Sequence, residues 1–502
     1  MSEKRTSSAN KNSAFLELGL KESVKLLIEQ TQTLYLSDEI PWVVGYSGGK
    51  DSTATLQLTW MALEGLPPEK RHKPIYVIST DTQVENPVVA KWVENSLETM
   101  TQTATEKGLN VKPHRLTPAV QDTFWVNLIG KGYPAPRFKF RWCTERLKIN
   151  PSNAFVRDVV KENGEAILIL GVRKAESSGR NHRMKKFEAQ RIREFLSPST
   201  SLANCFIYSP IENWSNDDVW LYLMQYKNPW GYTNKDLLTM YQGASPDGEC
   251  PLVLDTTTPS CGDSRFGCWV CTLVDKDKSM NAMVQNDEEK NWMRPLMKFR
   301  DLLDPKSEKE RKVRDFRRMS GAVQALREEN SVPGPYLQEW REHLLKELLK
   351  AQIWIQKNGP TYVKNLELIS MPELIEIRRV WVMDKHEMED NLPRIYESVM
   401  GVPFPGQQLD DNNAFGLEEM EVLKNLCGEN RIQYELAREL IHLEQSYKHM
   451  SKRSGLFKAL EDVLKKHFFE NEKDAVDWAW KRKLSKDEAS SDLKDIDQEL
   501  VS

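Results

Sequence analysis

The chain has 502 residues, and its 70 Lys and Arg against 74 Asp and Glu give a formal net charge of −4. That length predicts two or three domains, and the near balance of charge gives no global nucleic-acid signature, so any such site would be a local patch. The sequence lacks an apolar stretch approaching the roughly 18 residues of a membrane span and lacks the apolar core of a signal peptide, so we expect a cytoplasmic protein with no membrane partner.

Composition divides the chain into five predicted segments. Residues 1–13 are polar and are expected to be disordered, and residues 486–502 form a polar tail that is expected to fray. Between them we expect an α/β domain at 14–245, a cysteine-rich segment at 246–280 and a helical C-terminal domain at 281–485.

Short apolar runs alternate with helical patterns in the predicted α/β domain. Such runs are typical of the buried strands of a parallel sheet, and their alternation with helices predicts an α/β fold with a doubly wound parallel sheet. The expected strands are 42–46, 75–79 and 166–172, and the expected helices are 14–38, 53–64 and 88–107. After residue 280 apolar residues recur at helical spacing, most clearly at 339–356, 431–450 and 455–468.

The first predicted strand ends in Ser-Gly-Gly-Lys-Asp-Ser, residues 47–52, and a predicted helix follows. Glycines allow the backbone to approach a polyphosphate closely, and the start of a helix offers free N–H groups with a partial positive charge. Lys50 can neutralise phosphate charge, and Asp51 can cap the helix or hold Mg²⁺. The spacing differs from that of a Walker A loop. The pattern therefore predicts a site for ATP with Mg²⁺.

This loop resembles the hallmark of the PP-loop ATP pyrophosphatases, which have the adenine nucleotide alpha-hydrolase-like fold. Four further segments resemble the PAPS reductase family, and in the first of them Gln83 stands where that family usually has glycine. The segments are 80–87, 141–151, 171–180 and 210–220. The resemblance implies that Lys50 and Asp51 are catalytic and that ATP is bound by Tyr46, Ser47, Gly48, Gly49, Lys50, Asp51, Ser52, Asp81, Gly171, Arg173 and Arg180. Arginine suits such a site because its planar fork of donors matches phosphate oxygens.

Five of the seven cysteines are candidates for metal binding or sulfur chemistry, since structural disulfides are uncommon in a cytoplasmic chain. Cys268 and Cys271 have the C-x2-C spacing that lets two thiolates bind one metal centre. In one assignment Cys250, Cys261, Cys268 and Cys271 are the ligands, and Cys143 is the catalytic sulfur carrier. In the other, which the resemblance to APS reductases implies, Cys143 joins Cys268, Cys271 and one of Cys250 or Cys261 as a ligand.

Soft thiolate ligands fit an iron–sulfur cluster or zinc, and the resemblance to sulfur-handling enzymes favours a [4Fe–4S] cluster over zinc. The segment 260–271, with Cys250 before it and a helical half after it, resembles the DndC family, the PAPS-reductase-like component of DNA phosphorothioation. That resemblance implies an ATP-dependent sulfurtransferase that adenylates a DNA backbone phosphate, releases pyrophosphate and inserts sulfur at a non-bridging oxygen. It also implies DNA, a cysteine desulfurase as sulfur donor and other Dnd-system subunits as partners.

Contact with DNA requires local positive charge, and the stretches 180–193 and 300–318 are rich in Lys and Arg. We expect Arg183, Lys185 and Lys186 to contact DNA, although either stretch could be a solvated helix face. Two other functions are compatible with the loop: an APS or PAPS reductase-type sulfonucleotide enzyme, and a tRNA-thiolating PP-loop enzyme. The chain is longer than a reductase requires, and RNA-binding modules are not evident in it.

Overall fold

The computed structural model divides into two compact units. The first comprises Met1–Ala119 and Arg137–Met297, and the second comprises Val120–Pro136 and Lys298–Ser502. The residues that the structure describes are 13–191, 193–244, 267–305, 308–328, 330–407, 415–448, 450 and 452–499. Most of the predicted cysteine-rich segment, including Cys250 and Cys261, lies outside these ranges.

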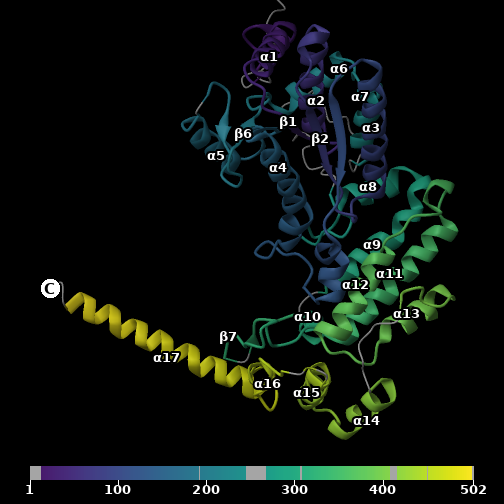
Figure 1. Ribbon diagram of the computed structural model, residues 1–502, viewed down its shortest axis with the longest axis vertical. Helices are drawn as coiled ribbons and strands as arrows, with labels where there is room; N and C mark the ends of the chain where they lie inside the picture. The colour runs from purple at the N-terminus through teal and green to yellow at the C-terminus, as the bar shows by residue number, and fades with distance from the viewer. Residues whose placement is uncertain are drawn as a thin grey trace, which may run out of the picture. The chain divides into compact units, whose positions relative to one another are not determined.

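Within the described residues the first unit holds a six-stranded sheet in the order β3-β2-β1-β4-β6-β5 (Figure 1). Neighbouring strands run parallel, except for β5, which pairs antiparallel with β6. The strands are β1 Trp42–Gly45, β2 Ile75–Thr80, β3 Val111–Leu116, β4 Ala166–Ile169, β5 Ser197–Pro198 and β6 Cys205–Tyr208. The three strands predicted from apolar runs are confirmed as β1, β2 and β4.

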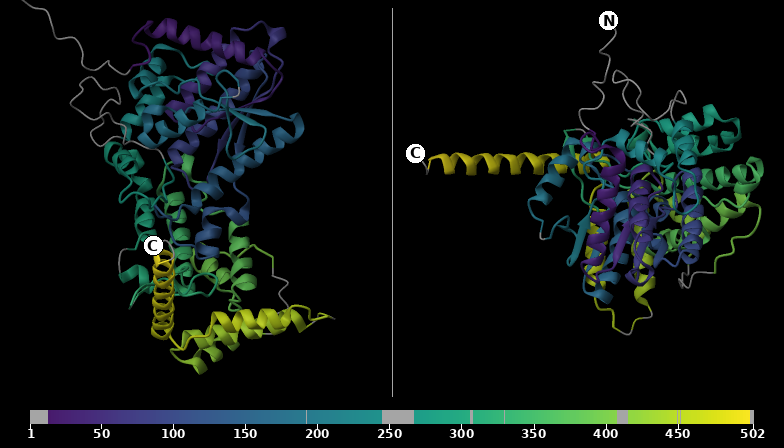
Figure 2. Two further views of the ribbon diagram at one scale, coloured as in Figure 1. Left: turned by 90° about the vertical axis from the view of Figure 1, so that its left-hand side faces the viewer. Right: turned by 90° about the horizontal axis from the view of Figure 1, so that it is seen from above.

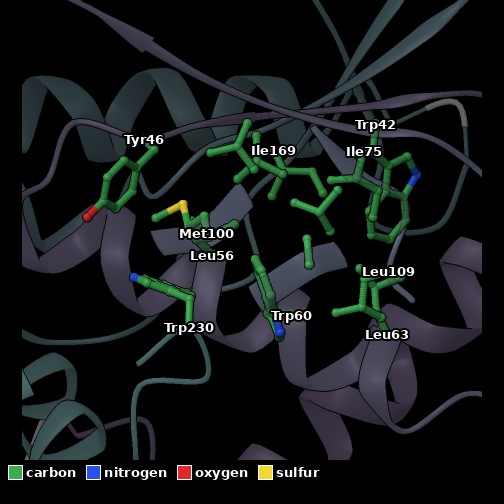
Figure 3. Close-up of a cluster of buried hydrophobic side chains, with 14 of the residues drawn as sticks. Trp42, Tyr46, Leu56, Trp60, Leu63, Ile75, Met100, Leu109, Ile169 and Trp230 are labelled. Carbon is green, nitrogen blue, oxygen red and sulfur yellow. The ribbon is translucent and has the colours of Figure 1, made fainter. Parts of the chain in front are cut away.

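Helices cover both faces of this sheet, which confirms the doubly wound fold (Figures 1 and 2). Successive residues of a strand point to opposite faces. Trp42 and Val44 of β1 therefore join one apolar cluster with residues of α2 (Lys50–Glu64) and α3 (Pro87–Glu106). Val43 packs on the other face against α4 (Asn150–Asn163). Figure 3 shows the first cluster, in which Trp42, Leu56, Trp60, Met100 and Trp230 are buried.

The first unit contains further helices, of which α1 and α6 pack against α2. They are α1 Gly19–Leu36, α5 Ser178–Glu188, α6 Asn216–Gln225, α7 Asn234–Gly243 and α8 Lys278–Asn286, with the short helical turns η1 Pro68–Lys70, η4 Thr144–Ile149, η5 Lys174–Glu176 and η6 Glu288–Met293. The helix α9, Arg294–Leu303, spans the boundary in sequence between the two units. No described helix combines the length and the apolar character that crossing a bilayer would need.

The second unit is mostly helical, as the sequence predicts. The expected helices at 339–356, 431–450 and 455–468 are confirmed as α11, α15 and α16. The helix α17 continues to Glu499, through most of the predicted polar tail, in a sequence rich in good helix formers (Figure 2). The elements are η2 Val120–Asp122, η3 Val126–Gly130, α10 Glu308–Lys312, β7 Ala325–Arg327, β8 Asn330–Ser331, α11 Gln338–Asn358, η7 Thr361–Val363, α12 Met371–Arg379, η8 Val380–Asp384, α13 Asn391–Met400, α14 Leu417–Cys427, α15 Arg431–Lys448, α16 Leu456–Lys466 and α17 Glu472–Glu499.

Residues 120–136 belong to the second unit, although they lie within the predicted α/β segment in sequence. The indole of Trp125 donates to the carbonyl of Leu368 over 2.6 Å. The indole of Trp381 donates to the carbonyl of Ile129 over 2.9 Å. This stretch therefore links into the helical unit by hydrogen bonds from buried tryptophans.

A histidine pair in the second unit predicts a dependence of stability on pH. The Nδ1 atoms of His386 and His442 lie 2.6 Å apart, and burial, followed by the neighbouring charge of His442, lowers the pKa of His386 to about 4. An unfolded histidine titrates near pH 6.5, so the unfolded chain binds this proton more readily between these two values. The stability is therefore present above pH 6.5 and is lost as the pH falls toward 4.

We expect the wild type to lose roughly 1–3 kcal/mol more stability than His386→Asn between pH 7 and pH 4. Asparagine tolerates the left-handed backbone of His386, whose φ is 58°. Urea unfolding at a series of pH values measures the difference. Parallel profiles for the two proteins would show that His386 is not the titrating group.

Candidate active site

The phosphate loop lies where an open α/β sheet is expected to bind its ligand. The chain leaves β1 into the loop, adds β2 and β3 on one side, and then returns to β4 on the other side of β1. The loops after β1 and β4 therefore flank the point where the strand order reverses, which is the usual ligand crevice of such folds. A cavity of about 930 Å³ opens here, within the size range of ligand pockets.

Close packing at Gly48 and hydrogen bonds of Ser52 fix the conformation of the loop backbone. Gly48 has a φ of 73°, and a Cβ at this position would lie 2.5 Å from a methyl group of Val93. The hydroxyl of Ser52 donates to the carbonyl of Gly49 over 3.0 Å and accepts from the backbone N–H of Ser47 over 3.2 Å. The helix α2 then begins at Lys50, so its first turn faces the same crevice as the loop.

Asp51 lies between two cations. Its Oδ2 is 2.9 Å from Nζ of Lys50, and its Oδ1 is 2.6 Å from Nε of Arg173. Arg173 is buried and also donates from Nη1 to the carbonyl of Trp214 over 3.3 Å. Of the two roles considered for Asp51, a helix cap and Mg²⁺ binding, the cap is absent, because Gly49 takes the N-cap position without a side-chain bond. The carboxylate instead joins the loop to the segment after β4.

Gly171 lines the cavity and also lets two backbones touch. A Cβ on Gly171 would lie 2.7 Å from the carbonyl oxygen of Asp51 and 3.0 Å from the amide nitrogen of Ser52. Backbone atoms cannot move aside as a flexible side chain can. The glycine that the family motif identified is therefore required by the close approach of the segment after β4 to the first turn of α2.

We expect Gly171→Ala to lower the free energy of unfolding by about 1–3 kcal/mol through overpacking and to impair nucleotide binding by displacing the loop. Gly179→Ala, eight residues further along, is the matched control, because a Cβ there meets nothing within 4 Å. Urea unfolding and nucleotide titration of both variants measure the difference. If Gly171→Ala behaved like Gly179→Ala, the contact would not constrain the loop.

Asp81 does not line the 930 Å³ cavity. Its carboxylate accepts from the guanidinium of Arg115, with Nε at 3.1 Å, and from the backbone N–H of Gln83 at 2.8 Å. Gln83 replaces the family's glycine and has a left-handed φ of 62°, which explains why glycine is usual at this position. In this conformation Asp81 is part of a small neighbouring cavity.

Arg180 lines the main cavity, where its guanidinium pairs with Glu176. The three residues expected to contact DNA, Arg183, Lys185 and Lys186, follow it on α5 and are exposed. The structure therefore places positive charge both in the cavity and on the helix that leads away from it.

The C-x2-C segment pairs with the chain that follows β2. The backbone N–H of Trp269 donates to the carbonyl of Val84 over 3.0 Å, and the N–H of Asn86 donates to the carbonyl of Gly267 over 3.2 Å. The sulfur of Cys268 lies 3.4 Å from the hydroxyl of Thr82. Since Gly267 itself lines the main cavity, this pairing brings the cysteine segment to the rim of the phosphate-loop site.

Cys143 belongs to a different segment of the chain and lies directly before η4. Burial raises the pKa of its thiol, and the neighbouring charge of Cys271 raises the pKa further. Burial also raises the pKa of Cys268 to about 11, although Lys148 opposes the rise. The charge of Cys271 thus contributes to the raised pKa of both Cys143 and Cys268. Their soft donor atoms suit an iron–sulfur group or zinc.

The described residues do not form a complete metal site. The described ranges contain no group of three His, Cys, Asp or Glu side chains arranged to hold a metal ion. Of the predicted ligands, Cys250 and Cys261 lie outside those ranges. The ligand set of either assignment includes at least one of them.

Lys148 and Glu85 are site residues that sequence reasoning missed. Lys148 Nζ lies 3.3 Å from Glu85 Oε1, and both residues line the cavity. Burial acts to lower the pKa of Lys148, but the charges of Cys268, Glu85 and Cys143 raise it to about 12. Lys148 is the lysine of the K-x-x-P pattern in the family-like segment 141–151, so that pattern was the signal for it.

Comparison with known proteins finds a family match within the predicted α/β segment. Residues 41–233 match the family model of the phosphoadenosine phosphosulfate reductase domain. Over 252 residues the chain is 30% identical to the uncharacterized protein MJ0066 of Methanocaldococcus jannaschii, and the match covers 50% of this chain and 40% of that protein. The chain thus spans less than half the length of that relative.

Two solved structures are similar at low identity. The FMN adenylyltransferase of Candida glabrata, in complex with FAD and inorganic pyrophosphate, is 11% identical, with 48% of this chain and 68% of that chain covered and a TM-score of 0.25. The U34-tRNA thiolase NcsA of Methanococcus maripaludis, with its [4Fe-4S] cluster, is 14% identical, with 57% and 82% covered and a TM-score of 0.25. Residues 41–233 therefore resemble a phosphoadenosine phosphosulfate reductase domain, with the phosphate loop near their start.

Proposed function

We propose that this protein is an ATP-dependent sulfurtransferase that inserts sulfur at a non-bridging oxygen of the DNA backbone. The observation that most supports the proposal is that one cavity is lined both by the phosphate loop and by Gly267 and Lys148, which border the cysteines. A nucleotide-activating site and a set of sulfur-bearing side chains are thereby adjacent. A phosphate oxygen is a poor leaving group, so activation by ATP must precede its replacement.

In the activation step the loop and the first turn of α2 bind the ATP phosphates, with Lys50 and Arg173 offsetting their charge. Phosphate oxygens that bind these two cations release the carboxylate of Asp51, which would then hold Mg²⁺. The DNA phosphate attacks the α-phosphorus of ATP, and pyrophosphate leaves. Cations fixed in place around the developing charge lower the barrier of such a transfer.

In the second step a sulfur nucleophile attacks the activated DNA phosphorus, and AMP leaves. One assignment makes Cys143, Cys268 and Cys271 ligands of a [4Fe–4S] cluster together with Cys250 or Cys261. When bound, such a cluster would supply the sulfur-handling chemistry at the rim of the cavity. The other assignment makes Cys143 the persulfide carrier, and a further thiol must then cleave the S–S bond of the DNA adduct and become half of a disulfide.

The proposed partners are those that the resemblance to the DndC family implies. The exposed basic residues of α5 would contact the DNA backbone, since positive charge drives such binding. A cysteine desulfurase would supply sulfur, and other Dnd-system subunits would supply sequence recognition, in the reducing cytoplasm.

The test begins with protein purified without oxygen and incubated with ATP and DNA. We expect pyrophosphate and AMP as products, with loss of both in Asp51→Ala, and sulfur-modified dinucleotides after nuclease digestion of DNA when a desulfurase and cysteine are added. ADP as the product would contradict the activation step. Sulfite formation from a sulfonucleotide would favour a reductase, and thiolated tRNA would favour a tRNA-modifying enzyme.

For the cysteines, iron content and the absorbance near 400 nm are measured in Cys143→Ser. Loss of the chromophore would make Cys143 a ligand. A retained chromophore with lost sulfur transfer would make it the carrier.

A further inference from the structure

Five consecutive exposed residues, Arg-Phe-Lys-Phe-Arg at 137–141, precede Cys143 by two positions. They form a tight turn, in which the backbone N–H of Phe140 donates to the carbonyl of Arg137 over 2.8 Å and the N–H of Arg137 donates back over 3.2 Å. Phe138, at the tip, is 73% exposed, and Phe140 is 44% exposed. Neither the phosphate loop nor the cysteine site uses this turn.

The exposure of Phe138 at the tip of this turn is not explained by folding. Turn tips favour Gly, Asn, Asp and Ser, because these residues satisfy turn geometry and solvent. A phenylalanine held in water forgoes the stabilisation that burial would give it. The guanidinium of Arg141 lies 5.1 Å from the centre of the Phe138 ring. This cation–π contact orients the ring while leaving most of it accessible.

The turn also presents unneutralised positive charge. Lys139 and Arg141 are exposed, and neither joins an ion pair within the part of the chain that the structure describes. Aromatic rings that bases can stack on, interleaved with cations that track phosphates, form the usual surface for single-stranded nucleic acid. A duplex hides the faces of its bases in the stack, so such rings select an unpaired or extruded nucleotide.

The turn lies close to the proposed reaction site. An extended chain spans at most about 3.6 Å per residue, so the Cα of Arg141 lies within about 7 Å of that of Cys143, and the Cα of Phe138 within about 18 Å. A strand whose base stacks on Phe138 therefore needs to extend by only a few nucleotides to reach Cys143.

We propose that the turn at 137–141 is a stacking platform for unpaired nucleotides, with Phe138 and Phe140 holding bases and Lys139 and Arg141 holding phosphates. The proposal rests on the proposed function in taking DNA as the substrate. It adds that the DNA strand is opened where sulfur is inserted.

Fluorescence anisotropy of a labelled single-stranded oligonucleotide, and of the same sequence as a duplex, tests the platform on the full-length protein purified without oxygen. For Phe138→Ala combined with Phe140→Ala we expect single-strand affinity to fall about tenfold or more, because stacking on one ring is worth roughly 1–3 kcal/mol per base, and duplex affinity to change less than about twofold. Tyrosine at both positions should retain binding, and leucine should not. The control is Phe468→Ala, whose side chain is likewise 73% exposed but lies in the other unit.

Charge is tested separately. For Lys139→Gln we expect the slope of log affinity against log salt to fall by about 0.7, the value for one phosphate contact on a single strand. Equal losses on duplex and single strand, or no loss on either, would overturn the platform. Unchanged DNA affinity with weakened binding of a cysteine desulfurase would overturn it too and would make the turn a protein-docking surface.

These outcomes are separable from those of the proposed function. Oligonucleotide binding is measured without ATP, so a Phe138-dependent preference for single strands could stand even if no sulfur entered DNA. Conversely, sulfur insertion that persisted in the double alanine variant, with unaltered binding, would leave the proposed function intact and remove the platform.

Discussion

Replacing Arg173 by methionine is expected to lower pyrophosphate release from ATP by about a hundredfold or more, because fixed charges at a reacting phosphate are typically worth 10²–10³ in rate. Arg173 is 4% exposed, and its guanidinium is held by Asp51 and by the carbonyl of Trp214. The bond to the Trp214 carbonyl keeps the guanidinium in place when phosphate oxygens replace the carboxylate of Asp51. Methionine keeps similar bulk and removes the charge. Steady-state release of pyrophosphate, resolved into kcat and KM, measures the effect.

Two further variants interpret the result. Arg173→Lys restores the charge but not the planar fork of donors, so we expect only partial recovery. Arg180→Met removes a second cavity arginine, whose side chain is 38% exposed and paired with Glu176, and we expect a loss of less than about tenfold because solvent screens that charge. An Arg173→Met protein with reduced stability but wild-type release would make this arginine a structural partner of Asp51 alone.

The sheet was predictable where its strands are buried on both faces. The strands β1, β2 and β4 consist of apolar runs, because helices cover both of their faces. The strand β3 was missed since its sequence, Val-Lys-Pro-His-Arg-Leu, contains Lys, His and Arg and lies at the edge of the sheet. An edge strand pairs on one side only and keeps polar side chains, so it gives no continuous run.

Contacts between residues far apart in the sequence could not be predicted from local sequence patterns. The apolar character of residues 124–129 is visible in the sequence, but Trp125 bonds to Leu368, which is 243 positions away. Periodicity reports which face of an element is buried and does not report what buries it. For this reason the sequence alone left residues 120–136 in the α/β segment.

The site was predictable to the extent that its chemistry is local. The phosphate loop, Gly171 and Arg173 came from motifs, and the structure brings them together around Asp51. Lys148 was missed because its role depends on convergence: it meets Glu85 and the cysteines only after β2, η4 and the C-x2-C segment are assembled. Asp81 is the opposite case: a motif predicted it as an ATP-binding residue, but its carboxylate pairs with Arg115 and does not line the main cavity.

Glu387→Ala is expected to lower the free energy of unfolding of the second unit by about 3–5 kcal/mol, the usual cost of leaving a buried charge without its partner. The side chains of Arg341 and Glu387 are 2% and 5% exposed and form a two-point ion pair. The guanidinium also lies 5.3 Å from the Trp381 ring and donates to the carbonyls of Tyr336 and Gly130. Hydrogen exchange of the α11 amides across a urea series measures the loss in this unit.

The loss of stability in Glu387→Ala is compared with two other variants, to separate the cost of an unpaired buried charge from that of a lost contact. Glu347→Ala breaks an exposed pair with Lys350 on the same helix, whose side chains are 34% and 52% exposed, and we expect it to cost less than about 0.5 kcal/mol. Arg341→Met combined with Glu387→Leu removes both charges and should restore most of the stability, because an apolar pair of similar volume is often neutral or better. If the double variant lost as much as Glu387→Ala, the packing of Arg341 against Trp381 and its bonds to backbone carbonyls would be the stabilising feature, and the ion pair would only satisfy the charge that they require.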